Sequence, residues 1–197
     1  MPRTADTTRS PAADTPTMAI RGVWALPLIA LVASLVVLAS PATATPSTSR
    51  GAVALSSLES GVLQDLNQIR TRHGLVPLKL SAGLSAASAQ HSREMGADGY
   101  FEHASDDGTA FWKRIGRWYG QNGFHYWSVG ENLLWSSPDV DPAAALQLWM
   151  NSPEHRANIL TARWREIGVS AVHVAAASGT YKGLEVTIIT TDFGFRH

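Results

Sequence analysis

Two histidines and an acidic residue in the second half of the chain have side chains that suit metal binding or proton transfer. They are His103, Glu131 and His155, and a further acidic residue, Glu154, precedes the last of them. Imidazole and carboxylate groups bind zinc and other divalent ions, and a carboxylate can also orient a metal-bound imidazole from behind. Because long intervals separate these residues, only the fold can bring them together. Each also has a purely structural interpretation, as a loop hydrogen bonder, an ion-pair partner or a helix-start charge.

The segment WMNSPEHRANIL, residues 149–160, predicts one helix ending and another beginning. Ser152 is a favoured N-cap residue type, and Pro153 suits the first helical position, where a missing N–H costs nothing. His155 then lies in the first turn, where the positive end of the helix dipole disfavours an imidazolium. The sequence therefore predicts a neutral His155, the form that binds metal or accepts a proton.

Apolar residues that recur with the helical period predict the helices that surround these side chains. The predicted helices cover residues 56–73, 81–98, 109–119 and 143–151, with a fifth that starts at Pro153. In the first helix, Ser56 and Glu59 have the spacing of a capping box. The second places His91 on a face of mostly small residues that suits close packing. A lone histidine on such a face is either a hydrogen-bonded core residue or a ligand.

Three segments have the character of β-strands. They cover residues 127–135, 169–177 and 184–195, and a short turn between the last two predicts an antiparallel hairpin. Gly130 lies inside the first strand, where a glycine indicates a bulge or a close backbone approach. Four or five helices and about three strands predict an α+β fold in layers, with helices covering the sheet.

The first 44 residues have the composition of an export signal. A polar stretch precedes Arg21, an apolar run covers residues 23–39, and Ala-Thr-Ala ends at Ala44. This pattern predicts a secretory signal cleaved after Ala44, and the alternative is an uncleaved single-span membrane anchor. We therefore expect a disordered N-terminus with a signal over 1–44, a linker over 45–55 and one folded domain over 56–197, located outside the cytoplasm.

The residue composition, the net charge and the absence of known motifs exclude several classes of functional site. The chain has no cysteine, so disulfides, thiolate zinc sites and a cysteine nucleophile are excluded. The formal net charge is zero, without the basic surface that nucleic acid requires. The metalloprotease, α/β-hydrolase, phosphate-loop and dinucleotide motifs are also missing.

Six of the seven tryptophans lie between residues 112 and 164. They suggest either a packed aromatic core or a ligand groove lined by some of them. The predicted helix over 109–119 is expected to point Phe111, Trp112 and Ile115 inward.

Several ordered segments together resemble the CAP superfamily, in particular its short bacterial branch. This superfamily groups cysteine-rich secretory proteins, venom antigens and plant pathogenesis-related proteins. The segments are LNQIRTRHGLVPL, AQHSREM with YFEH, GENLLW, LWMNSPEHRANIL with WREIGV, and TTDFGF, which cover about residues 60–197 in the family's order.

The resemblance implies a three-layer α-β-α sandwich whose central cleft is lined by two histidines and two acidic residues. His103, Glu131 and His155 match three of these positions. At the fourth, this chain has Ser152 where eukaryotic members have a glutamate, and Glu154 lies nearby without matching. The resemblance also implies that zinc or another divalent ion binds at the two histidines. Sterol or lipid binding and proteolysis have been attributed to individual members.

The sequence is compatible with three functions. The leading hypothesis is a secreted binding module whose cleft holds a divalent metal or a small ligand, such as a lipid, without turnover. The second is a metal-dependent hydrolase of peptide or cell-wall bonds, with Glu131 as general base and the histidines as ligands. The third is a non-catalytic surface interaction protein whose polar cleft only stabilises the fold.

Overall fold

The computed structural model describes residues 53–197. The sequence predictions for residues 1–44 and for most of the linker over 45–55 therefore lie outside the described residues. The helices are α1 (Ser57–Arg72), α2 (Ala82–Asp98), α3 (Phe111–Trp118), α4 (Pro142–Asn151) and α5 (Pro153–Ile159), with a short 3-10 turn η1 at Gly179–Tyr181. The strands are β1 (Lys79–Leu80), β2 (Trp127–Ser136), β3 (Glu166–Ala177) and β4 (Leu184–Arg196).

The four strands form one mixed sheet in the order β1-β3-β4-β2. The predicted hairpin of β3 and β4 is present, β2 pairs antiparallel with β4, and β1 runs parallel to β3. The sequence predicted about three strands and missed β1, because two residues are too few to show an alternating pattern. The strand order places β2 at one edge of the sheet and β1 at the other.

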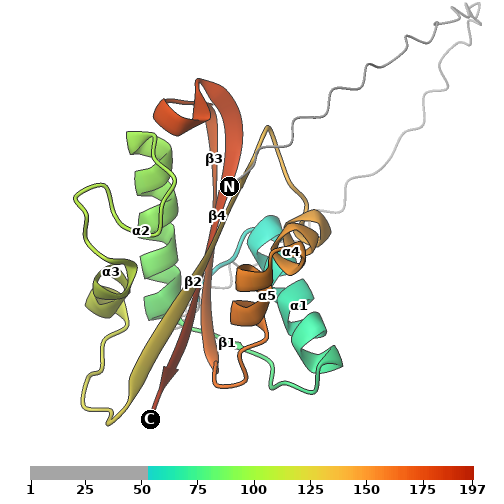
Figure 1. Ribbon diagram of the computed structural model, residues 1–197, viewed down its shortest axis with the longest axis vertical. Helices are drawn as coiled ribbons and strands as arrows, with labels where there is room; N and C mark the ends of the chain where they lie inside the picture. Colours follow the sequence, from blue (N-terminus) through green and yellow to red (C-terminus); the bar gives the residue numbers. More distant parts are fainter. Residues whose placement is uncertain (1–52) are drawn as a thin grey trace, which may run out of the picture. The chain divides into compact units, whose positions relative to one another are not determined.

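Helices cover both faces of the sheet, which makes the three-layer α-β-α sandwich that the sequence predicted (Figure 1). Alternating side chains of β4 supply the two cores: Phe193 packs with Leu66 of α1 and Trp149 of α4, whereas Ile188 packs with Met95 of α2. Strand alternation thus assigns each residue of β2 and β4 to one helical layer or the other. Within residues 53–197, no helix has the length and apolar character needed to cross a membrane.

Two of the predicted helix starts can be compared with the structure. The capping box at α1 is confirmed, because Ser56 Oγ accepts from the Glu59 backbone N–H and the Glu59 carboxylate accepts from the Ser56 N–H. At α5, Ser152 has the extended backbone of an N-cap and Pro153 is the first helical residue. The Ser152 side chain, however, makes no capping hydrogen bond. The turn that carries His155 is therefore held by other contacts.

Helix α2 packs closely on the sheet because its inward face is small. Ala87, Ser88 and Ser92 are fully buried. Opposite the start of the helix, Gly168 of β3 lies so close that a Cβ atom there would be 2.1 Å from the backbone carbon of Leu84. The contact leaves no room for any side chain at this position.

We expect Gly168→Ala to lower the free energy of unfolding by about 1–3 kcal/mol, because the helix backbone would have to move away from the sheet. Urea unfolding of the domain measures this. The control is Gly116→Ala within α3, where a new Cβ would meet only a tryptophan ring carbon at 3.9 Å. That variant should be neutral or more stable by about 0.5–1 kcal/mol, because alanine favours a helix interior over glycine. Equal stability of both variants would contradict the close packing.

Candidate functional site

The candidate site includes side chains on both faces of edge strand β2, because successive side chains of a strand point to opposite faces of the sheet. Glu131 points to the layer of α2 and α3, where it meets His103 and Arg114. The next residue, Asn132, points to the layer of α4 and α5, where its amide donates to the backbone carbonyl of His155 at 3.2 Å. Consecutive residues of one strand therefore contact the segments that carry the two histidines, one from each side of the sheet.

Glu131 is the buried centre of this arrangement, with its side chain 1% exposed. His103 Nδ1 lies 2.8 Å from Glu131 Oε1. The guanidinium of Arg114 donates to Oε2, and it also donates to the backbone carbonyl of His103 at 2.9 Å. Both carboxylate oxygens are thus engaged. Since a carboxylate only accepts, His103 presents its Nδ1–H to Glu131, which leaves Nε2 as the ring nitrogen without a proton.

A second buried acid lies beside Glu131 on the neighbouring strand. Asp192 of β4 is the register partner of Glu131 and is fully buried, and it accepts a hydrogen bond from Ser88 Oγ at 2.9 Å. Burial raises the pKa values of both carboxyl groups. For Glu131 the next cause is Arg114, which lowers the pKa, whereas for Asp192 the next cause is the Glu131 charge, which raises it further. One guanidinium balances one carboxylate, and Arg114 contacts Glu131 directly. We therefore assign the negative charge to Glu131 and the proton to Asp192.

His155 is half-buried at the start of α5. Burial, and then the neighbouring His103, lower the pKa of His155, so the neutral ring predicted from the helix dipole is favoured. Its Nδ1 atom is buried and has no hydrogen-bond partner in the described part of the chain. Burial, and then Arg114, likewise lower the pKa of His103. Both imidazoles thus offer an unprotonated nitrogen at neutral pH.

Two asparagines hold the His155 turn against the strand. Asn158 Nδ2 donates to the Glu131 carbonyl at 3.2 Å and to Asn132 Oδ1 at 2.9 Å, and the Asn158 carbonyl accepts from the Trp164 indole. A Cβ atom on Gly130 would come within 2.7 Å of Asn158 Oδ1. The glycine therefore marks a close approach of a neighbouring side chain, and the pairing of β2 with β4 runs through it without a bulge.

All four candidate residues from the sequence line one cleft of about 350 Å³. His103, Glu131, Glu154 and His155 share its walls with Phe111, Gly130, Asn132 and Asn158. Glu154 is exposed at the rim. Among residues 53–197, no three His, Cys, Asp or Glu side chains form a recognisable metal-binding group.

His91 takes the core alternative of its two predicted roles. It is fully buried on α2, its Nε2 lies 2.9 Å from the Glu102 carbonyl, and it does not line the cleft. The nearest Glu131 oxygen is 4.0 Å away. Burial lowers the pKa of His91 to about 3, so its ring stays neutral through the physiological range.

The sequence prediction for α3 was wrong at Trp112, which is 47% exposed, and it overlooked Arg114, which is fully buried. Arg114 lies on the same helical face as Phe111 and Ile115, and the Glu131 carboxylate draws the guanidinium inward. Asp192 was also missed. An arginine on an apolar helix face and an aspartate within an apolar strand are the signals that could have identified them, because buried charges occur where they are paired.

Comparison with known proteins identifies the class of domain. Residues 63–189 match the CAP family, described as the cysteine-rich secretory protein family, and the chain belongs to this family. It is 32% identical over 136 residues to the uncharacterized protein YkwD of Bacillus subtilis, an alignment that covers 68% of this chain. The chain spans 50% of the length of that relative.

Two solved structures show the same fold. An extracellular protein of Bacillus anthracis that contains an SCP domain is 29% identical, with a TM-score of 0.51 over 73% of this chain and 45% of that chain. An outer surface protein of Borrelia burgdorferi is 18% identical, with a TM-score of 0.56 over 69% of this chain and 90% of that chain. The similarity to the Bacillus anthracis protein supports membership of the bacterial branch of the family. The similarity to the Borrelia burgdorferi protein supports the fold alone.

The depressed pKa of His91 predicts part of the acid sensitivity of the domain. The unfolded chain would take up a proton near pH 6.5, whereas the folded ring resists it down to about pH 3. Between these pH values the unfolded chain binds the proton and the folded chain does not. The free energy of unfolding therefore decreases progressively as pH falls from about 6.5 to about 3. Urea unfolding of wild type and His91→Gln across this range should show a steeper acid loss in wild type. Parallel pH curves would contradict this assignment.

The asparagine network predicts a local stability effect. Asn158→Ala leaves the Asn132 amide oxygen and the Glu131 carbonyl short of a donor, which costs roughly 1–3 kcal/mol of unfolding free energy. The control is Asn151→Ala at the exposed end of α4, expected to change stability by less than about 0.5 kcal/mol. Chemical denaturation compares the two, and similar values for both variants would show that Asn158 has no special role.

Proposed function

We propose that this CAP domain is exported and that its cleft binds a divalent metal ion, zinc foremost, through His103 and His155 without turning over a substrate. One observation carries the proposal: His103 Nδ1 pairs with the buried Glu131 carboxylate in a cleft that His103 and His155 line together. This pairing leaves Nε2 of His103 without a proton. A carboxylate behind an imidazole is the usual partner of a metal-binding histidine, because it fixes the tautomer and raises the basicity of the ring.

The unpartnered nitrogen of His155 supports the same proposal. A buried ring nitrogen without a hydrogen bond is unfavourable unless another group uses its lone pair. The lowered pKa values of both histidines keep them in the form that binds metal. A bound ion would supply Lewis acidity and a fixed positive charge to the cleft, and Glu154 at the rim would favour the approach of a cation.

The position of Glu131 favours binding over hydrolysis. A general base must reach the proton that it removes, yet both oxygens of Glu131 are engaged and its side chain is 1% exposed. We therefore assign Glu131 to orienting His103, in place of the ligand or base considered from sequence. The cleft, at about 350 Å³, lies at the small end of the roughly 300–1,000 Å³ of ligand pockets, which suits an ion with a small ligand better than a sterol.

Export is supported by the N-terminal sequence and by the relatives. An apolar run and an Ala-Thr-Ala ending precede the domain. The similar proteins from Bacillus anthracis and Borrelia burgdorferi are described as extracellular and as an outer surface protein. The absence of cysteine is compatible with any redox environment.

Calorimetry with zinc tests the metal proposal. We expect saturable zinc binding to the domain at pH 7, weakened at least tenfold in His103→Ala and in His155→Ala because each removes a ligand. Glu131→Gln should weaken it by about 10–100-fold through loss of the orienting carboxylate. His173→Ala, an exposed histidine on β3, is the matched control and should not change the affinity.

Two results would overturn the proposal. The first is the absence of any heat of zinc binding, or a loss of binding in His173→Ala as large as in His103→Ala and His155→Ala. Either outcome would exclude a specific two-histidine site. Hydrolysis of casein or peptidoglycan by wild type and not by Glu131→Gln would instead establish the hydrolase.

A further inference from the structure

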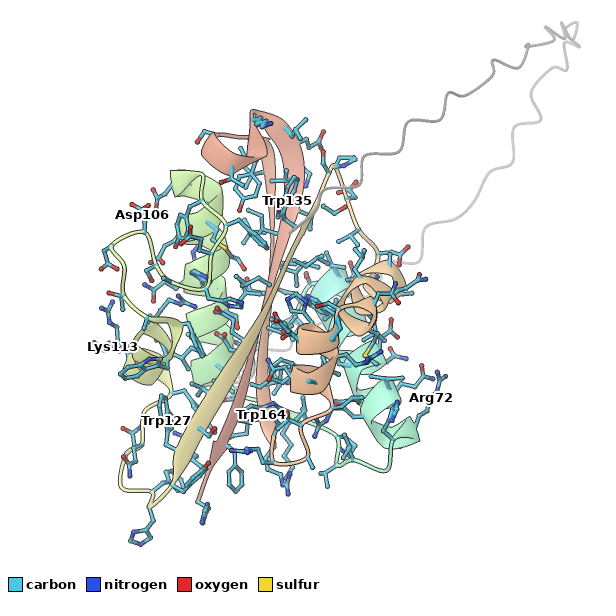
Figure 2. All side chains as sticks on the ribbon, viewed as in Figure 1. Arg72, Asp106, Lys113, Trp127, Trp135 and Trp164 are labelled. Atoms are coloured by element: carbon cyan, nitrogen blue, oxygen red, sulfur yellow. The ribbon has the colours of Figure 1, made fainter. Side chains whose placement is uncertain are left out.

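A second pocket of about 350 Å³ lies on the α3 side of the sheet, and it shares no lining residue with the cleft. Its walls come from α3, from the loop that follows α3 and from the start of β2. The lining residues are Trp112, Lys113, Gly116, Gly120, Gln121 and Trp127. Figure 2 shows Lys113 and Trp127 on this side of the molecule. Neither the fold nor the metal proposal assigns a role to this pocket.

Two indole rings form the apolar part of the pocket. Trp112 is 47% exposed, although a tryptophan is normally buried for most of its surface. Trp127 is half-buried, and its indole N–H donates to the Tyr119 carbonyl at 2.6 Å, which fixes the orientation of the ring. Gly116 lies beside the Trp127 ring, and a Cβ atom there would meet only Trp127, at 3.9 Å. The glycine thus leaves the space beside the indole open.

Polar groups stand at the rim of the same pocket. The ammonium of Lys113 lies 5.3 Å from the centroid of the Trp112 ring. The amide nitrogen of Gln121 donates to the Phe124 carbonyl at 2.7 Å, which holds the side chain in place and leaves its amide oxygen as an acceptor. The pocket therefore combines flat apolar faces with one positioned donor group and one positioned acceptor.

We propose that this pocket binds a sugar ring of a glycan chain. A pyranose has C–H groups on its faces and hydroxyls around its edge, so its faces can lie on indoles while its hydroxyls reach Lys113 and Gln121. A lipid chain would require a closed apolar cavity, and this pocket opens to solvent. A nucleic acid would require several cations along a track, and among the described residues Lys113 is the one cation that lines the pocket.

The path along β2 favours a chain of sugars over a single sugar. The second pocket ends at Trp127, and the cleft begins at Gly130 of the same strand. Three residues of strand span about 10 Å. A glycan seated at Trp127 could therefore continue along the sheet edge toward the cleft. The binding of the sugar at Trp127 is independent of the metal proposal.

The test is a fluorescence titration of the metal-free domain with three tetrasaccharides, of N-acetylglucosamine, glucose and galacturonic acid. We expect at least one of them to change the tryptophan emission saturably. Trp112→Ala should raise the Kd of that sugar at least tenfold, because it removes one stacking surface. Gly116→Leu should raise it as much by filling the space beside Trp127. The Leu variant is expected to fold, because the site is open and leucine favours helix.

Trp118→Ala is the matched control. Trp118 is 51% exposed on the same helix, donates to Gln90 and does not line the pocket, so its loss should change the Kd less than twofold. Circular dichroism melting confirms that each variant is folded. The proposal is overturned if none of the three sugars saturates, or if Trp118→Ala weakens binding as much as Trp112→Ala. Because the titration uses the metal-free domain, its outcome is separate from the outcome of the zinc test.

Discussion

The ion pair between Arg114 and Glu131 is the constraint on which the site depends. Both side chains are removed from water, so the free energy of desolvating two charges must be offset by their attraction and by further hydrogen bonds. The His103 ring and the His103 backbone carbonyl provide those bonds, one to each partner. Leaving either charge unpaired would cost roughly 3–5 kcal/mol, a large fraction of the stability of a domain. The burial of this carboxylate therefore depends on Arg114, and His103 adds a hydrogen bond to it.

Asp192, which lies beside Glu131, limits the negative charge that these buried groups can hold. Two carboxyl groups face one guanidinium on adjacent strands, and only one negative charge can be balanced there. A protonated Asp192 keeps Glu131 as the charged acceptor for His103. The buried polar groups on this face of the sheet thus act together to select one tautomer of one exposed imidazole.

The edge position of β2 explains how residues from two separate layers meet in one cleft. A central strand is flanked on both sides by other strands, whereas an edge strand lets side chains from both faces reach the same opening. His103 lies in the loop before α3, and His155 lies in α5 on the opposite face of the sheet. The Glu131 carbonyl on the open edge is satisfied by Asn158. Side-chain donors thus cover part of a strand edge that would otherwise be free to pair with another chain.

Much of this arrangement could be predicted from the sequence. Helical periodicity and strand alternation identified five helices and three of the four strands, and the ordered motifs identified the family and the residues His103, Glu131 and His155. Spacing could not reveal that Glu131 is buried and fully engaged, because this depends on Arg114 and Asp192, which lie on other elements. Single-residue patterns treat an arginine as a surface residue, so the helix face around Trp112 was predicted wrongly. Long-range charge pairing is a property of the packed layers, and local sequence does not encode it.

The tautomer of His103 shows directly whether the Glu131 carboxylate orients this ring. Long-range ¹H–¹⁵N correlation spectra of the metal-free domain at pH 7 distinguish a protonated Nδ1 from a protonated Nε2. We predict a neutral ring with the proton on Nδ1, held by the Glu131 carboxylate, and a bare Nε2. A ring protonated on Nε2 alone would mean that Glu131 does not orient His103, and the proposed site would lose its basis.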